Sequence, residues 1–218
     1  MRRALLCSLL LCLLPGCGRS STGSAAEVPQ GYAEGVAAGR REKDRQFVVD
    51  PDSPIPAGLR NAFHGLDYWP VDPRYRLTVP LEELATKERF TIVTTMGEAR
   101  PCERFGTLTF TLDGADLHLT VYHLLDGRQT GTAADLFVPF MDATTGKETY
   151  PAGRYVSLEE AGDGRYVLDF NLAFNPSCAY GAPERFQCPR TPAENRLAVA
   201  IRAGERGWRT PNGADGAL

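Results

Sequence analysis

The sequence lacks a block of basic residues, and it lacks a second long apolar run after its first segment. Its 24 Lys and Arg are outnumbered by 27 Asp and Glu, which gives a formal net charge of −3 at pH 7. Proteins that bind nucleic acid through phosphates carry a concentrated basic face, so we expect no nucleic-acid partner. Because a membrane-spanning helix needs about 20 apolar residues, the body of the chain is expected to be a globular domain.

Several catalytic motifs are also missing. The chain contains no Gly-x-Ser-x-Gly motif and no His-Glu-x-x-His motif, which excludes the simplest serine-hydrolase and zinc-peptidase hypotheses. The run Thr145–Thr149 is similar to a phosphate-binding loop, but Met141 stands where the first glycine belongs and Glu148 where the Ser or Thr belongs. Nucleotide binding is therefore not supported.

The first segment has the features of a secretory signal. Arg2 and Arg3 precede the apolar run 4–14, which is too short to span a bilayer. The run ends in Leu-Pro-Gly-Cys17, which resembles the bacterial lipoprotein signal, in which the cysteine is lipidated and becomes the new N-terminus. We therefore expect a lipoprotein signal peptide at residues 1–16 and lipid attachment at Cys17; an ordinary secretory signal is the alternative.

Lipidation of Cys17 would place the protein in the cell envelope, because two or more acyl chains anchor a protein stably to a membrane. An aspartate directly after the lipidated cysteine would resemble an inner-membrane retention signal, but this chain has Gly18 there. In a Gram-negative source we therefore expect the protein on the periplasmic face of the outer membrane. Residues 17–30 are rich in Ser, Gly and Ala, which is typical of a flexible tether. A disordered tail is expected at residues 211–218.

Beyond the signal peptide and the lipidated Cys17, three cysteines remain. In an oxidising compartment Cys178 and Cys188 are the natural disulfide pair, which leaves Cys102 as a lone buried thiol. Reduced, packed thiols are one alternative. A zinc site is another, but it needs four ligands and would have to recruit His123 or Cys102. Apart from zinc, no cofactor is predicted.

Residues 31–210 are expected to form a single domain that begins with a helix. From Gly31 to Val48 apolar residues recur at near-helical spacing, which predicts an amphipathic helix weakened by Gly35 and Gly39. Its basic cluster is expected to be a solvated helix face; it comprises Arg40, Arg41, Lys43 and Arg45. Prolines at 51, 54 and 56 predict an extended connection, and residues 59–63 a helical turn.

Further along the chain the apolar residues alternate. The runs 90–96, 108–112 and 116–123 read as strands, and Asp113-Gly114 predicts a hairpin between the last two. Two later strands are predicted at 166–174 and 197–201, the first with Asp169 and Asn171 on its polar face. The pattern indicates a mainly β (α+β) fold, an antiparallel barrel or sandwich-like domain with an N-terminal helix.

Polar and aromatic residues gather in the stretch from Phe140 to Glu205. It contains a tight turn at 142–146, in which Asp142 can act as a cap, and a long loop from 175 to 194. Arg154 is expected to pair with Asp169 or Glu148. We take as the candidate ligand site Asp142, Glu148, Tyr150, Arg154, Asp169, Asn171, Asn175, Tyr180, Glu194 and Asn195.

Several longer motifs carry a family resemblance. They are KDRQF from Lys43, HGLDYWPVDPRYRL from His64, FMDATTGKETYPAGRY, LDFNLAFNPSCAY, CP, ENRL and IRAGE. Together they resemble the domain-of-unknown-function 1684 family over about 31–205. The resemblance implies no established activity. It implies that the family pattern includes the ten candidate residues and Phe140, Gly146, Thr149, Gly153, Tyr155, Pro176, Cys178, Cys188, Pro189 and Glu205. Phe174 departs from it, since tyrosine is expected there.

The leading hypothesis is a non-enzymatic envelope lipoprotein. It would bind a small or polymeric envelope ligand, or a partner protein, through the surface from Phe140 to Asn195. One alternative is a hydrolase that uses two of Asp142, Glu148, Asp169 and Glu194, with His123 as a further candidate. The other is a structural metal domain built on Cys178 and Cys188. The sequence does not indicate an oligomeric state.

Overall fold

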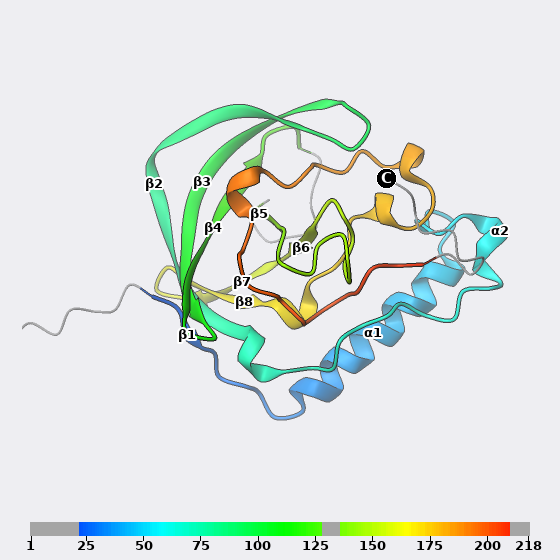
Figure 1. The fold of residues 1–218 in the computed structure, drawn as a ribbon, viewed down its shortest axis with the longest axis horizontal. Helices are drawn as coiled ribbons and strands as arrows, with labels where there is room; N and C mark the ends of the chain where they lie inside the picture. Colours follow the sequence, from blue (N-terminus) through cyan, green and yellow to red (C-terminus); the bar gives the residue numbers. More distant parts are fainter. Residues whose placement is uncertain (1–21, 128–135, 210–218) are drawn as a thin grey trace, which may run out of the picture.

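The computed structural model describes residues 22–127 and 136–209 (Figure 1). The predicted signal peptide, Cys17 and the C-terminal tail lie outside the described residues. The strands are β1 Ser24–Ala25, β2 Arg76–Val93, β3 Ala99–Leu112, β4 Ala115–Leu124, β5 Leu136–Phe140, β6 Arg154–Val156, β7 Leu158–Gly162 and β8 Arg165–Asp169. The helices are α1 Tyr32–Val49, α2 Ala57–Arg60 and short 3-10 turns at Pro73–Tyr75, Phe170–Leu172, Ser177–Ala179, Pro183–Arg185 and Ala193–Asn195.

The strands form an antiparallel sheet in the order β6-β5-β4-β3-β2-β8-β7, with β1 paired to β2. β6 ends at Val156 and β7 begins at Leu158, so the two ends of this order are joined by Ser157 alone. The sheet therefore curls into a half-barrel (Figure 1). This confirms the predicted mainly β, barrel-like fold.

The predicted hairpin is present between β3 and β4. Leu112 pairs with Ala115 across the turn, and Asp113 and Gly114 have φ of 51° and 79°. Positive φ at both central residues gives the turn that matches the twist of paired strands. Along β3 and β4 the apolar side chains alternate inward, and Leu108, Phe110, Leu119 and Val121 are fully buried. They form the main core between the curled strands.

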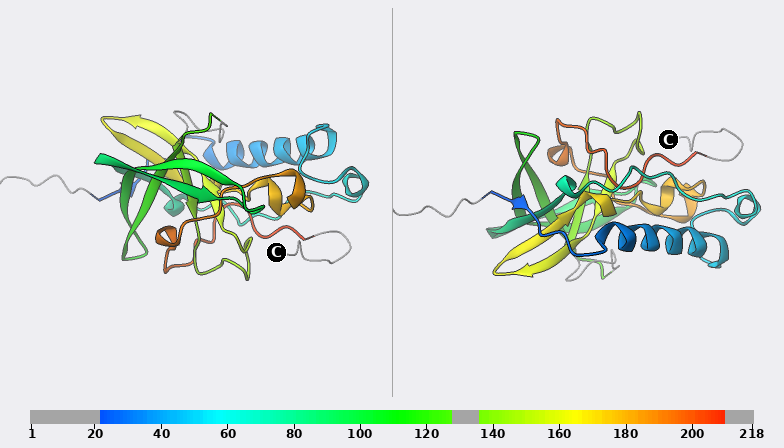
Figure 2. Two further views of the ribbon diagram at one scale, coloured as in Figure 1. Left: turned by 90° about the horizontal axis from the view of Figure 1, so that it is seen from above. Right: turned by 90° about the horizontal axis from the view of Figure 1, so that it is seen from below.

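Helix α1 confirms the predicted N-terminal helix and lies along one side of the molecule (Figure 2). Among its residues only Val36 is buried. The extended segment after α2 runs back beside it (Figure 1), where Arg40 donates to the Trp69 carbonyl at 2.9 Å and the Leu66 amide donates to Asp44 at 3.1 Å. Polar contacts, more than apolar packing, therefore hold this helix to the body.

The predicted strand at 166–174 is shorter in the structure. β8 ends at Asp169, whose carboxylate accepts the Asn171 amide at 3.0 Å and caps a 3-10 turn at Phe170–Leu172. The turn breaks the alternation, so that Asp169 and Asn171 are buried while Leu172 is 53% exposed. The local side-chain cap outcompeted the strand pattern.

The predicted last strand at 197–201 is absent. Leu197 and Ile201 are buried as expected, but the segment is irregular. Its backbone groups have partners outside a strand ladder: the Ile201 amide donates to Asp142 at 2.6 Å, the Ile201 carbonyl accepts from Arg154 at 2.8 Å, and the Leu197 amide donates to the Met141 carbonyl at 2.8 Å. Buried backbone groups that already have partners do not require a ladder.

Part of the predicted flexible tether is ordered. The Gly23 amide donates to the Thr109 carbonyl at 2.8 Å, and Ser24 and Ala25 pair with β2. The chain therefore joins the sheet edge from residue 23 onward. No helix within the described residues has the length and apolar character needed to cross a bilayer.

Candidate functional site

The ten predicted site residues lie in several separate surroundings. Arg154 and Asp142 are buried in one polar cluster, with Arg154 Nη2 3.5 Å from Asp142 Oδ2. Arg154 also donates to the carbonyls of Ile201, Ala203 and Glu205 at 2.5–3.0 Å. The predicted pairing of Arg154 with Asp169 or Glu148 is wrong, because the buried Asp142 is the nearer carboxylate.

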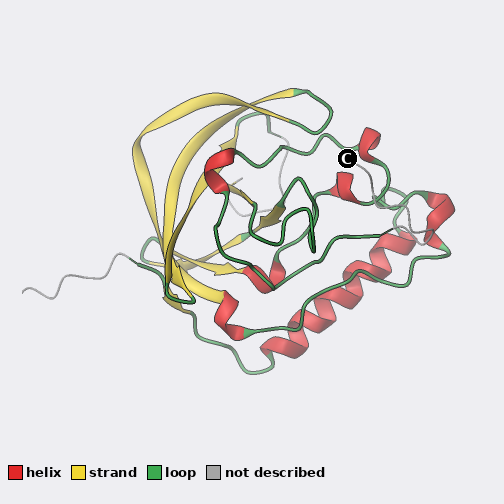
Figure 3. Cartoon of the chain, viewed as in Figure 1, coloured by secondary structure: helices red, strands yellow, loops and turns green. Residues whose placement is uncertain are grey.

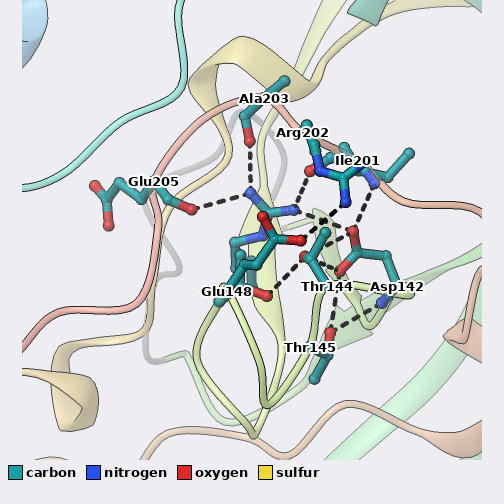
Figure 4. Close-up of polar contacts among 10 residues, drawn as sticks. Asp142, Thr144, Thr145, Glu148, Ile201, Arg202, Ala203 and Glu205 are labelled. Carbon is teal, nitrogen blue, oxygen red and sulfur yellow. Dashed lines mark hydrogen bonds and ion pairs between the residues drawn. The ribbon is translucent and has the colours of Figure 1, made fainter. Parts of the chain in front are cut away.

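Asp142 is itself a cap, as its place in the turn predicted. Its carboxylate accepts the hydroxyls of Thr144 and Thr145 (Figure 4). Burial lowers the pKa of Arg154 to about 10, an effect that Asp142 partly offsets, so the guanidinium stays charged at neutral pH. Because Arg154 Nη1 and Nη2 and the Asp142 carboxylate all bind other parts of the chain, the cluster stabilises the fold; Arg154 Nε has no partner among the described residues.

Three more predicted residues are structural or exposed. Asn195 is fully buried, and its side-chain amide pairs with both the amide and the carbonyl of Thr120 at 2.8 Å. Glu194 forms an ion pair with Arg104 at 2.8 Å on the surface. Glu148 pairs with Arg202 at 3.1 Å, also at the surface. None of these three contributes to a common site.

The two late cysteines lie side by side as buried free thiols, so the structure does not contain the predicted disulfide. The Cys178 amide donates to Cys188 Sγ at 3.3 Å, and Tyr150 Oη lies 3.7 Å from Cys178 Sγ. The Cys188 thiol donates to Cys178 and lowers the pKa of Cys178 to about 7. Cys102 is buried apart from them, and burial raises its pKa to about 12.

No group of three or more His, Cys, Asp or Glu is placed to hold a metal ion within residues 22–127 and 136–209. His123, the predicted third ligand, instead faces Glu103 across the strand pair at 3.2 Å. The zinc hypothesis built on Cys178, Cys188 and His123 is therefore contradicted.

The four carboxylates of the hydrolase hypothesis are likewise separated. Asp142 is enclosed in the core beside Arg154, and Glu148 and Glu194 form their own surface ion pairs. Only Asp169 of the four lines the large pocket described below. No two of them converge on one cavity.

Asp169 and Asn171 do lie together, and they face helix α1. Tyr32 Oη donates to both Asp169 oxygens at 2.9 and 2.7 Å. Desolvation and this contact with Asp169 raise the Tyr32 pKa. The Asn171 amide side chain donates to the Asp72 carbonyl and accepts from the Asp72 amide, both at 2.9 Å. The two side chains thus tie α1 and the segment before β2 to the end of β8.

A second network ties the middle of α1 to the C-terminal segment. Lys43 forms an ion pair with the buried Glu205. Glu205 also accepts from Tyr180 Oη at 2.5 Å and from the Asn175 amide at 2.8 Å. Burial, followed by Glu205, raises the pKa of Tyr180. Asn175 and Tyr180, predicted as ligand contacts, therefore serve to position Glu205.

Between these two networks lies a pocket of about 620 Å³, which we call the α1 pocket. It separates α1 from the end of the sheet, the turn after β8 and the C-terminal segment. Its lining consists of Pro29, Gln30, Gly31, Tyr32, Gly35, Val36, Gly39, Arg40, Lys43, Tyr68, Arg76, Glu159, Asp169, Asn171, Leu172, Ala173, Phe174 and Glu205.

The helix wall of the α1 pocket is one face of α1. Tyr32, Val36, Arg40 and Lys43 recur at helical spacing, and Gly35 and Gly39 stand on the same face. A Cβ added to either glycine would meet no atom within 4 Å. A helix packed on a protein body ordinarily has large apolar side chains on its inner face. At Gly35 and Gly39 this helix has none, and the space beside it stays open.

Both walls of the pocket contain buried hydrogen-bond donors without partners. Arg76 Nε and Nη1 are buried and meet no acceptor among the described residues, and neither do Arg40 Nε or Tyr68 Oη. Arg76 lies 3.9 Å from Asp169 but donates no hydrogen bond to it. Unpartnered buried donors are uncommon in folded proteins. Of the seven buried side-chain atoms without a partner among the described residues, four belong to residues that line this pocket, and the others belong to Tyr122, Arg154 and Asn175.

Sequence reasoning missed most of this pocket. Of the predicted site, only Asp169 and Asn171 line it, whereas Arg40 and Lys43 were assigned to a solvated face. Arg41 and Arg45 are exposed, so the basic cluster is divided between two faces. The signal that was present is the recurrence of Tyr32, Gly35, Gly39 and Lys43 on one helical face.

A smaller cavity of about 460 Å³ lies between the turn at 146–151 and the segment 206–209. It contains Glu148 and Tyr150, two further predicted residues, together with Lys147 and Trp208. It lacks a set of buried unpartnered groups among the described residues. We therefore take the α1 pocket as the candidate site.

The chain matches the family described as "Protein of unknown function (DUF1684)" over residues 61–206. It is also similar to an uncharacterised protein of Haloarcula marismortui solved by solution NMR, with 38% identity and a TM-score of 0.60. That similarity covers 81% of this chain and 95% of the other. No curated protein matches. The chain therefore belongs to the DUF1684 family of proteins of unknown function.

Proposed function

We propose that this chain is a ligand-binding domain whose binding site is the α1 pocket, and that a lipid on Cys17 holds it in the cell envelope. The observation that carries the proposal is the glycine face of α1. Gly35 and Gly39 lie opposite buried charged residues and leave the intervening space open. The pocket volume is within the range of small-molecule sites.

The glycines are costly for the helix itself. Each destabilises a helix interior by up to ~1 kcal/mol relative to alanine. Glycines on a helix face commonly permit another backbone to approach closely, but at these two positions no atom comes near. The packing of the fold therefore does not require them, whereas a ligand that enters the pocket would.

The scattering of the acidic residues favours binding over hydrolysis. A carboxylate pair acts as acid and base only when both groups reach the same bound substrate. Asp142, Glu148, Asp169 and Glu194 do not meet that condition in this fold.

The position of the tether supports the proposal that the domain is held near a membrane surface. Pro29 and Gln30 line the α1 pocket, and the chain leaves the sheet edge at Gly23. From Gly23 back to Cys17 an extended chain reaches at most roughly 22 Å. A lipid on Cys17 would therefore keep the domain close to the bilayer.

Native mass spectrometry tests the proposal. A lipid-free form, in which an ordinary secretory signal replaces residues 1–17, would be purified from a bacterial periplasm without detergent and incubated with an envelope extract. We expect an added small-molecule mass on this protein. The mass should be absent from Gly39→Leu, whose side chain fills the pocket, and present on Ala38→Leu, which adds the same group to the exposed helix face.

Two results would overturn the proposal. One is that the lipid-free form acquires no small molecule from the extract. The other is that Gly39→Leu retains the bound mass as fully as Ala38→Leu does, which would place the ligand elsewhere on the protein.

A further inference from the structure

The two buried carboxylates in the wall of the α1 pocket are already occupied by donors. Asp169 accepts from Tyr32 Oη, from the Asn171 amide at 3.0 Å and from Asn171 Nδ2 at 3.1 Å. Glu205 accepts from Tyr180 and the Asn175 amide and pairs with Lys43. Neither carboxylate therefore has much remaining capacity to receive a donor from a ligand.

Two arginines of the pocket lining, in contrast, have hydrogen-bond donors that no acceptor occupies. Arg76 has a side chain only 11% exposed, and its Nε and Nη1 have no acceptor among the described residues. Arg40 uses Nη1 and Nη2 on the carbonyls of Trp69 and Asn171 at 2.9 and 3.1 Å, but its Nε is unpartnered. The Tyr68 hydroxyl is unpartnered as well.

Among the buried side chains of the lining, the remaining hydrogen-bond capacity is therefore that of donors; Glu159, a third carboxylate of the lining, is exposed. A ligand that complements it must bring acceptors. A guanidinium binds carboxylate and phosphate oxygens most strongly, through paired and charge-assisted hydrogen bonds. An anionic oxygen group also balances Arg76, whose only close carboxylate is already shared with Tyr32 and Asn171.

Part of the pocket lining is apolar. Val36 on the helix and Ala173 and Phe174 on the opposite side line it, and no polar atom of these side chains competes for the ligand. Leu172 also lines it and is 53% exposed, which is high for a large apolar side chain in this fold. Contact with an apolar ligand segment would remove that surface from water.

We propose that the α1 pocket binds an amphiphile that carries a carboxylate or a phosphate, with the anionic group at Arg76 and Arg40 and the apolar part between the α1 glycines and Leu172. The inference rests on the proposed function, because it assumes that the α1 pocket is the ligand site.

Isothermal titration of the lipid-free form with four probes of equal chain length tests the inference. The probes are decanoate, decyl phosphate, decanol and decyltrimethylammonium, each below its micelle concentration. We expect decanoate or decyl phosphate to bind roughly tenfold or more tighter than decanol, because hydrogen bonds to charged groups are the stronger ones. The cationic probe should bind least. Comparison of the two anions distinguishes a carboxylate from a phosphate ligand.

Two arginine variants locate the anionic group. Arg76→Met should reduce the preference for the anions over decanol to about threefold or less, because it removes the charged donor and keeps the apolar stem. Arg74→Met is the matched control, since Arg74 is exposed and lies outside the pocket lining. If Arg76→Met does not fold, Arg76→Lys serves instead, and it should weaken anion binding by losing the paired geometry.

The outcomes separate this inference from the proposed function. If all four probes bind equally and Gly39→Leu abolishes their binding, the α1 pocket is a ligand site and the anionic preference is wrong. If the anions bind more tightly but Arg76→Met and Arg76→Lys leave their affinity unchanged, the assignment to Arg76 is wrong. If no probe binds, the amphiphile inference is wrong, and the proposed function is judged by the extract experiment. If Gly39→Leu binds all four probes normally, the proposed function fails as well.

Discussion

Arg154 is the largest fully buried side chain of the described residues, and it determines the local course of the chain near the site. Its guanidinium donates hydrogen bonds to the carbonyls of Ile201, Ala203 and Glu205, and Asp142 balances its charge. The segment is thereby held in an irregular path whose end presents the Glu205 side chain to Lys43 of α1. A buried ion pair here acts on position more than on net stability.

Removal of the Asp142 carboxylate should therefore be severe. We expect Asp142→Ala to lower the free energy of unfolding by about 3–5 kcal/mol, because Arg154 would remain charged, buried and without its balancing group. Urea denaturation measures the difference. Glu148→Ala is the control: it breaks a surface pair with the exposed Arg202 and should cost less than about 1 kcal/mol. Equal losses in the two variants would contradict the buried role of Asp142.

The thiol pair gives a second prediction. After secretion into an oxidising compartment, peptide mapping should find a Cys178–Cys188 disulfide and a free Cys102, because the first two are adjacent and the third is buried apart. A disulfide that includes Cys102, or three free thiols after mild oxidation, would contradict it.

In the reduced protein the same pair should show an unequal acidity. The Cys188 thiol stabilises the Cys178 thiolate, which lowers the pKa of Cys178 to about 7 from the ordinary value near 9. Cys188→Ala removes that donor, so the Cys178 pKa should rise, and the thiolate should form at higher pH in an ultraviolet titration. An unchanged or lower midpoint would show that Cys188 does not set the acidity of Cys178.

For single residues, the sequence predicts the chemical type of the site better than the position of each side chain in the fold. Asp169 and Asn171 do lie together, but through the cap of a 3-10 turn and not along the strand face that the alternation predicts. The partners of Asp169 could not be predicted, since Tyr32 is 137 residues away in the chain. Arg40 was assigned to solvent because local charge does not indicate which face of a helix docks.

Among the secondary-structure elements, helix α1 lacks side chains at two positions of the face that lines the α1 pocket, Gly35 and Gly39. Gly39→Ala should raise the free energy of unfolding by about 0.5–1 kcal/mol, because alanine favours the helix and its Cβ meets no atom within 4 Å. Chemical denaturation measures this gain. A loss of stability in Gly39→Ala would mean that the position is already closely packed.

Gly106→Ala is the control for that prediction. A Cβ at Gly106 would lie 2.8 Å from the Glu82 carbonyl oxygen on the neighbouring strand, so this substitution should destabilise the protein. The opposite signs of the two changes would separate glycines retained for open space from glycines required by close packing.

Regular elements were predicted well and irregular ones poorly. The helix at 32–49 and the hairpin at 108–123 follow from local periodicity and turn chemistry. The segments 170–174 and 197–201 have the alternation of strands, but the Asp169 cap, Arg154 and single backbone bonds satisfy their backbone groups instead. Apart from the Asp169 cap and its 3-10 turn, these partners are distant in the sequence, and no local pattern reveals them.

For the whole molecule, the strands gather at one end, and most loops and helices lie at the other (Figure 3). The fold class was predictable because repeated alternating strands bury one face only by curling or stacking. The α1 pocket was not, because it forms where α1 and three other segments meet.

The membrane anchor is a prediction about the whole protein. We expect labelled palmitate to be incorporated into the full chain and not into Cys17→Ser, because the cysteine thiol is the acyl acceptor. The lipid-free form should fractionate with the soluble periplasm. Label in Cys17→Ser, or a full chain that remains unlabelled, would contradict attachment at Cys17.

NMR shift mapping of the isotope-labelled, lipid-free form titrated with decyl phosphate tests whether the α1 pocket is the ligand site. We expect the largest saturable amide shifts on Gly35, Gly39, Asn171 and Ala173, on both sides of the pocket. Shifts that concentrate instead around the cavity at 146–151 and 206–209, or that never saturate, would contradict it.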